Sequence, residues 1–351
     1  DANTTAANNT GIGWRALYTN TTGASNTAVG VQALDANTTG SDNVSVGLAT
    51  LTSDTLGNKS VAIGNYSLAY QNFTSATDTY NTAVGYQAGN RVTTGINNTL
   101  IGGLAGDALT DADYNVALGV GALTTDTLGS KSTALGSYAL SNQNFTSATD
   151  AHNTAVGNNA GGAVTTGINN TLIGSLAGDA ITTASYSVAV GQGAATNTTT
   201  SSQGFTAVGA DSLFTNTTGT DNVAVGRASM YYNTTGANNV AVGRSALQAN
   251  TTASNNTAVG YSALIANTTG HNNTAVGAAA LDANITGIEN VAVGSSSLSG
   301  NTTGVENTAV GQGALYANTT ASYNTAVGKS ALTANTTGAE NVALGAEALD
   351  A

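Results

Sequence analysis

The chain has 351 residues, of which only 7% are charged, and 19 acidic against 7 basic residues give a net charge of −12. The absence of cysteine excludes disulfides and cysteine-ligated metal sites, and the scarcity of Lys and Arg argues against a nucleic-acid partner. No apolar run approaches the roughly 18 residues of a transmembrane helix, so we expect no membrane insertion.

One repeat fills the sequence and reads N-T-A-V-G-x-x-A-L-x-A-N-T-T-G-x-x, with residues 26–42 as a clean copy. The glycine after the apolar pair marks each unit, for example Gly30, Gly47 and Gly64. These glycines are 17 residues apart except at two longer steps and one step of 18. The spacing predicts about 20 coils of a repeat protein.

Seventeen residues are too few for a two-helix repeat, and abundant Gly, Asn and Thr oppose a helix. The pattern predicts an all-β fold, a parallel β-solenoid (β-roll) that forms one continuous domain over residues 1–351. Within it, residues 43–114 and 115–186 are a tandem duplication. Four-residue bulges are expected near residues 72–78 and 144–150, where the two longer steps fall.

Side chains alternate between the two faces of a strand, so the Val of T-A-V and the Ala beside it point in opposite directions. We expect the Val face and the Leu of the following turn to form the core, at Val29, Leu34, Val46, Leu51, Ile63, Leu68, Val259 and Leu264. Four glycines interrupt the Leu column inside the duplication, and Val92 and Ile96 are candidates for filling that space.

Such a core is thin, because about one Val and one Leu per coil must offset the entropy of ordering 17 residues. We therefore expect chains to associate along their length. The small Ala/Gly face is the predicted contact between chains, at Ala28, Gly30, Ala258 and Gly260.

Asparagine recurs before each strand and in each N-T-T-G turn, where stacked side chains are expected to form hydrogen-bonded ladders. Many of these asparagines also lie in N-x-S/T sequons and are candidates for glycosylation. The ladder and glycosylation candidates are Asn37, Asn72, Asn144, Asn216, Asn233, Asn250 and Asn267. Aromatic residues near the bulges either pack the loops or face a ligand such as a surface glycan, at Tyr70, Phe73, Tyr80 and Phe145.

The sequence contains few residues of the types that carry out catalysis. The two histidines, His152 and His271, fall at non-equivalent positions of the repeat, and acidic residues are scattered rather than arranged in columns. The G-G-x-G-x-D signature of calcium-binding β-rolls is missing. We expect no enzymatic activity, no metal and no cofactor.

The repeat resembles the head repeats of trimeric autotransporter adhesins, and Val61-Ala62-Ile63-Gly64 matches their core. With 17 rather than 14 residues, it is even more similar to repeats of bacteriophage tail fibres. The resemblance implies a homotrimer of parallel β-rolls, extracellular, on a cell surface or on a virion, that mediates attachment. We expect a structural fibre shaft, open to end-to-end growth into a filament.

Ice binding is the alternative, because laddered Thr on a flat solenoid face is typical of antifreeze rods. The two Thr of N-T-T are adjacent and point in opposite directions, so Asn37 and Thr39 are the expected same-face pair. A well-behaved monomer with two free columns would favour this function, and a trimer that buries one face would favour the fibre.

Overall fold

The computed structural model describes residues 3–199 and 204–350. They form an all-β parallel β-solenoid of about 19 turns that follow one another at intervals of about 17 residues, and the described part contains no helix. The predicted fold class is confirmed. The chain divides into two units, Asp1–Leu176 and Ala177–Ala351.

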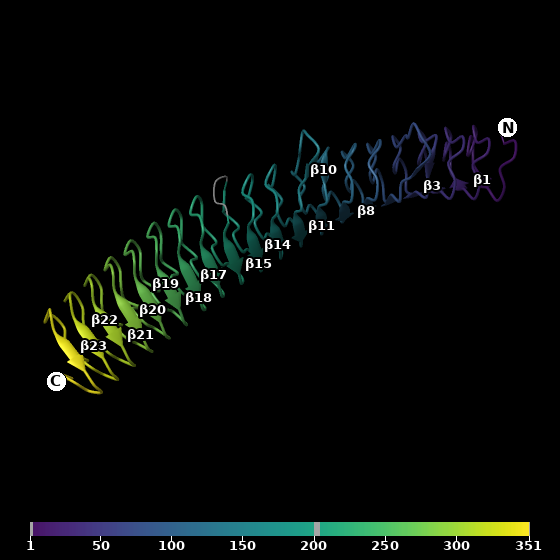
Figure 1. Cartoon of the computed structure of the whole chain (residues 1–351). Helices are drawn as coiled ribbons and strands as arrows, with labels where there is room; N and C mark the ends of the chain where they lie inside the picture. Colours follow the sequence, from purple (N-terminus) through teal and green to yellow (C-terminus); the bar gives the residue numbers. More distant parts are fainter. Residues whose placement is uncertain (1–2, 200–203, 351) are drawn as a thin grey trace. The chain divides into compact units, whose positions relative to one another are not determined.

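In each unit the strands of successive turns lie side by side, as Figure 1 shows. The strands of the first unit are β1 (Thr10–Ile12), β2 (Thr27–Val29), β3 (Val44–Val46), β4 (Gly57–Asn58), β5 (Val61–Ile63), β6 (Thr77–Asp78), β7 (Thr82–Val84), β8 (Thr99–Ile101), β9 (Val116–Leu118), β10 (Gly129–Ser130), β11 (Thr133–Leu135), β12 (Thr149–Asp150), β13 (Thr154–Val156) and β14 (Thr171–Ile173). Those of the second are β15 (Val188–Val190), β16 (Thr206–Val208), β17 (Val223–Val225), β18 (Val240–Val242), β19 (Thr257–Val259), β20 (Thr274–Val276), β21 (Val291–Val293), β22 (Thr308–Val310), β23 (Thr325–Val327) and β24 (Val342–Leu344).

The three-residue strands pair in parallel and in register, so equivalent residues of neighbouring turns lie side by side. Thr27 pairs with Val44 and Ala28 with Ser45, and in the second unit Val240 pairs with Thr257. Each column of the repeat in the sequence is therefore a column of side chains in space.

Backbone hydrogen bonds between turns continue beyond the strands. The N–H groups of Gln32, Leu34 and Asp42 donate to carbonyls of a neighbouring turn at 2.8–3.1 Å. These three residues have φ of 58°, 51° and 60°, a left-handed conformation that costs about 1–2 kcal/mol per residue outside glycine. The hydrogen bonds to the adjacent turns hold this unfavourable conformation in place.

The interior of each turn is narrow and holds small or planar side chains. In the turn of residues 26–42, Asn26, Ala28, Ala33, Leu34 and Asn37 are all fully buried. The strand contributes Ala, the following turn contributes Ala and Leu, and the two corners contribute Asn. The predicted core leucines Leu34, Leu51, Leu68 and Leu264 are fully buried.

The prediction for the strand orientation is wrong. The predicted core residues Val29, Val46 and Val259 are half-buried on the outer side of their strands, and Ile63 is 39% exposed. The physical reason is space: where Leu and two Asn already lie inside a regular turn, only the methyl group of Ala fits beneath the strand.

The Ala/Gly face is not a contact between chains. Ala28 and Ala258 are completely buried inside their own chain. A Cβ atom built on Gly30 would lie 2.2 Å from the carbonyl oxygen of Gly47 in the next turn, and Gly260 is equally crowded by the next turn. This glycine is required because its positive φ and the close approach of the next backbone leave no room for a side chain.

At Gly89, Gly106 and Gly161 of the Leu column, a Leu in a strand fills the space that the missing side chain leaves. A Cβ atom on Gly89 would lie 2.7 Å from Cδ1 of Leu100, which replaces Ala in the strand and is fully buried. Leu172 fills the same space beside Gly161 in the second copy of the duplication. Of the two residues predicted to fill this space, Val92 is fully buried and Ile96 is half-buried.

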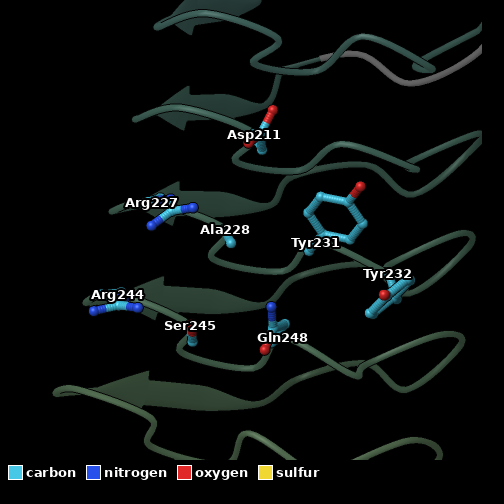
Figure 2. A pocket seen from close by; sticks show the side chains of 8 residues that line it. All are labelled: Asp211, Arg227, Ala228, Tyr231, Tyr232, Arg244, Ser245 and Gln248. Atoms are coloured by element: carbon cyan, nitrogen blue, oxygen red, sulfur yellow. The ribbon is translucent and has the colours of Figure 1, made fainter.

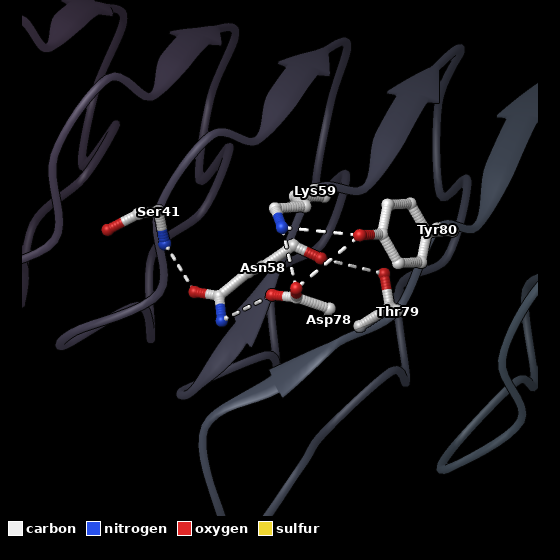
Figure 3. Close-up of polar contacts among 6 residues, drawn as sticks. All are labelled: Ser41, Asn58, Lys59, Asp78, Thr79 and Tyr80. Carbon is white, nitrogen blue, oxygen red and sulfur yellow. Dashed lines mark hydrogen bonds and ion pairs between the residues drawn. The ribbon is translucent and has the colours of Figure 1, made fainter.

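Each four-residue insertion adds a second small sheet, β4–β6 in the first copy and β10–β12 in the second. Beside β6, Lys59 Nζ donates to Asp78 Oδ2 at 2.6 Å and to Tyr80 Oη at 3.3 Å (Figure 3). Lys131 and Asp150 repeat the ion pair in the second copy. The ion pair with Lys59 lowers the pKa of the Asp78 carboxyl below its ordinary value.

Candidate functional site

The outer side of the strands forms the most regular surface of the molecule. We call it the strand face and define it as the first and third residues of the three-residue strands. In the described residues the first position is always Thr or Val and the third is always Val, Ile or Leu. No charged or amide side chain interrupts the strand face.

The strand face is solvent-accessible in a single chain. Most of its aliphatic side chains are half-buried, and the more exposed ones include Val293 at 37% and Leu118 at 42%. Most of them are β-branched, which restricts χ1 and holds the side chains in a regular array.

A more polar rim borders the strand face. The residue two positions before each strand is mostly polar, charged or Tyr, and it is exposed at Asp42, Tyr80, Tyr114 and Tyr186. An apolar centre with a polar and aromatic rim is the usual anatomy of a protein–protein interface.

The two Asn ladders run through the interior rather than along the surface. Nδ2 of Asn37 donates to Oδ1 of Asn20 at 2.8 Å and to the carbonyl of Gly40 at 3.0 Å. Oδ1 of Asn26 accepts from the N–H of Asn43 in the second ladder. Stacking satisfies the amides, so asparagine can be buried at little cost.

The prediction of glycosylation is therefore wrong for most of the named asparagines. Asn37, Asn216, Asn233, Asn250 and Asn267 are all fully buried, where a glycan on Nδ2 has no room. The proposed ice-binding pair of Asn37 and Thr39 fails for the same reason, because Asn37 points inward.

The sequons of the two insertions differ from the rest. Asn72 and Asn144 are exposed, and their Oδ1 atoms accept from Thr55 and Thr127 of the preceding turn. Glycosylation at these two residues stays a prediction.

The structure separates the four predicted aromatic residues into two pairs. Phe73 and Phe145 are 6% exposed and pack under the insertions, so their assignment as ligand-facing is wrong. Tyr70 is 59% exposed and lines surface hollows with Asn90 and Arg91. Tyr80 is exposed, with Lys59 Nζ 5.2 Å from its ring centroid.

The first run of the turn Asn ladder ends at Asn37, and a buried carboxyl group takes the next position of the column. Asp54 follows Asn37 in the ladder and is 1% exposed, with Oδ1 accepting from the N–H of Gly57 and Oδ2 accepting from Gln71 Nε2. Burial raises the pKa of Asp54, and these hydrogen bonds only partly oppose the shift. The Oδ1 atom of Asn37 has no donor.

Groups able to bind a metal or perform acid–base chemistry are sparse. Among the described residues, no three His, Cys, Asp or Glu side chains are grouped so as to hold a metal ion. Within the residues that the structure describes, no helix is long and apolar enough to cross a membrane.

Comparison with protein-family models and with curated proteins finds no match for the chain.

Proposed function

We propose that the chain is a non-enzymatic fibre shaft, extracellular on a cell surface or virion, that associates with copies of itself and serves in attachment. The observation that supports this most strongly is the strand face, which is free of charged and amide side chains and has a more polar rim. Association occurs through this face rather than through the Ala/Gly face. Three copies is the number that the resemblance to adhesin heads and tail fibres implies.

A second copy is the partner that suits the strand face best. Its side chains recur with the spacing of parallel strands, about 4.8 Å, turn after turn. A partner must follow the same repeat to match such a surface over several turns. Another copy of this chain meets that requirement, and burial of the aliphatic side chains supplies the driving force.

Charges placed on the strand face test the proposal. Val259→Asp combined with Val293→Asp puts two carboxylates on the face and leaves the buried residues intact. We expect the mass in solution, measured by light scattering, to fall to that of one chain. Circular dichroism should still report the β-solenoid.

Thr269→Asp is the matched control, since Thr269 is exposed in the same turn as Val259 but lies away from the strand face. It should leave the mass unchanged. A double variant that assembles like the unmodified chain would contradict the proposed interface.

Ice binding is the second candidate, and the strand face rather than the Asn/Thr turn favours it. The face presents two columns of Thr, Val and related aliphatic residues with restricted rotamers. This function requires the face to be free of other chains. Thermal hysteresis of a monomeric sample that is lost in Val259→Asp would support it.

A further inference from the structure

Two arginines of the second unit lie at equivalent positions in neighbouring turns. Arg227 and Arg244 each follow the end of a strand, β17 or β18, by two residues. Parallel stacking places their backbones about 5 Å apart, and like charges at such neighbouring positions repel. Both side chains are exposed, and neither belongs to an ion pair recorded in the described ranges.

An ordered group of aromatic rings lies beside this pair. Tyr231 stacks on Phe214 of the preceding turn, with ring centroids 4.9 Å apart and planes at 7°. Tyr232 meets Tyr231 edge to face at 4.7 Å and is 52% exposed. Mutual packing fixes the rings, so Tyr231 and Tyr232 form an ordered surface rather than two mobile side chains.

The arginines and tyrosines line one surface hollow of about 230 Å³. Figure 2 shows Arg227 and Arg244 along one side and the two tyrosines along the other. Asp211 and Gln248 also line it and add a carboxylate and an amide. The hollow thus combines guanidinium donors, aromatic rings and hydrogen-bond acceptors.

We propose that this hollow binds a saccharide that carries a carboxylate group. A guanidinium group matches a carboxylate through two parallel N–H···O bonds, and the paired arginines concentrate positive charge at one place in a chain whose net charge is −12. The C–H face of the sugar ring packs on the tyrosines, and its hydroxyls donate to Asp211 and Gln248. The inference rests on the proposed attachment function and names its ligand class.

The test is titration calorimetry of the full chain with a short oligogalacturonate, and with the same oligosaccharide after its carboxyl groups are reduced. We expect the carboxylated form to bind at least about ten-fold more tightly. Combined Arg227→Lys and Arg244→Lys keeps the charge but removes the two-pronged geometry, so affinity should fall about ten-fold. Tyr232→Ala should weaken binding several-fold without touching the arginines.

Lys329→Gln is the matched control, because Lys329 is a cation at the same position of a later turn, outside the hollow. It should leave affinity unchanged. Equal binding of the neutral oligosaccharide, or full affinity in the arginine variant, would overturn the proposal. Displacement by equimolar inorganic sulfate would also overturn it, since the site would then recognise any anion.

The mass of the arginine variant separates this site from the interface. An unchanged mass with lost binding supports the saccharide site, whereas a lower mass assigns the arginines to contacts between chains and overturns it. If the unmodified chain is monomeric but binds the acidic saccharide, the proposed assembly fails while the site stands.

Discussion

At the residue scale, asparagine is the side chain that defines the interior of this solenoid. A buried amide is normally costly, but here each one finds its donor or acceptor one turn away, as between Asn250 and Asn233 at 2.7 Å. The ladder depends on an unbroken column of amides. Asp54 shows the consequence of a break, because a carboxylate cannot donate to Oδ1 of Asn37.

Asp54→Asn gives Oδ1 of Asn37 a donor, but it also replaces the oxygen that accepts from Gln71 Nε2 with a second donor. We therefore expect Asp54→Asn to be more stable, by about 1–2 kcal/mol, than an equivalent variant that has the same loss and no such gain. Denaturant unfolding at neutral pH measures the change. Asp126→Asn is the matched control from the duplication: Asp126 is equally buried, but the fully buried Leu109 precedes it in the column. Asp126 Oδ2 likewise accepts from Gln143 Nε2, so Asp126→Asn has the same loss but no acceptor for its new donor. Equal changes in stability for the two variants would contradict the role of the ladder.

The contribution of Asp54 to the free energy of unfolding depends on pH. Its pKa is raised in the folded state, so its contribution to stability is complete below the ordinary value of 3.8 and is lost as pH rises through the folded pKa. Asp78 behaves oppositely: its pKa is lowered, so its contribution is present above 3.8 and is lost as pH falls further. Melting temperatures of the unmodified chain and Asp54→Asn should diverge as pH rises above about 4; parallel curves would show that Asp54 does not titrate in this window.

At the element scale, each turn must fill one fixed interior volume. Regular turns combine Ala in the strand with Leu in the following bend. In the duplicated block, Gly89 stands where a bend normally has Leu, and Leu100 of the next turn stands where a strand normally has Ala. The exchange also removes a left-handed Leu, because Gly89 has φ of 58° at no steric cost.

The exchange predicts coupled substitutions. Leu100→Ala alone should destabilise by about 2–5 kcal/mol through the cavity it leaves. Gly89→Leu alone should destabilise by about 1–3 kcal/mol through overpacking against Leu100. The combined variant refills, from position 89, part of the volume that Leu100→Ala empties, while Gly106 stays beside the remainder. It should be more stable than either single variant, as urea unfolding would measure, and strict additivity would contradict the shared volume.

The strands and their register were predictable, whereas the side of the strand that faces inward was not. The 17-residue spacing of glycines such as Gly30 and the alternation of T-A-V are enough to predict parallel strands in register. The prediction placed the larger Val inside, as is usual for a half-buried strand. The narrow turn reverses this rule, and Leu100 beside Gly89 is the sequence signal that indicates the Ala column is internal.

The candidate site could be predicted only in part. The left-handed conformation of Leu34 and the burial of Asn37 depend on hydrogen bonds between turns, which local residue preferences do not reveal. The hollow at Arg227 and Arg244 was missed because the two arginines are 17 residues apart. The repeat itself contains the signal, since the same column holds Arg in consecutive turns.

At the scale of the whole molecule, net charge and the strand face act in opposite directions on assembly. Copies that each carry a charge of −12 repel, and salt screens this repulsion over about 8 Å at physiological ionic strength. Apolar burial is not screened. We therefore expect assembly through the strand face to strengthen as salt is raised, measured by sedimentation velocity; dissociation by salt would indicate an interface dominated by ion pairs.

The central claim is that the strand face is covered by other copies of the chain. The mass of the unmodified protein in solution, measured by light scattering, tests it most directly. We expect a mass of three copies, about 103 kDa (three times 34.2 kDa), or larger species built from such trimers. A stable particle of 34.2 kDa with the strand face open to water would contradict it and favour ice binding.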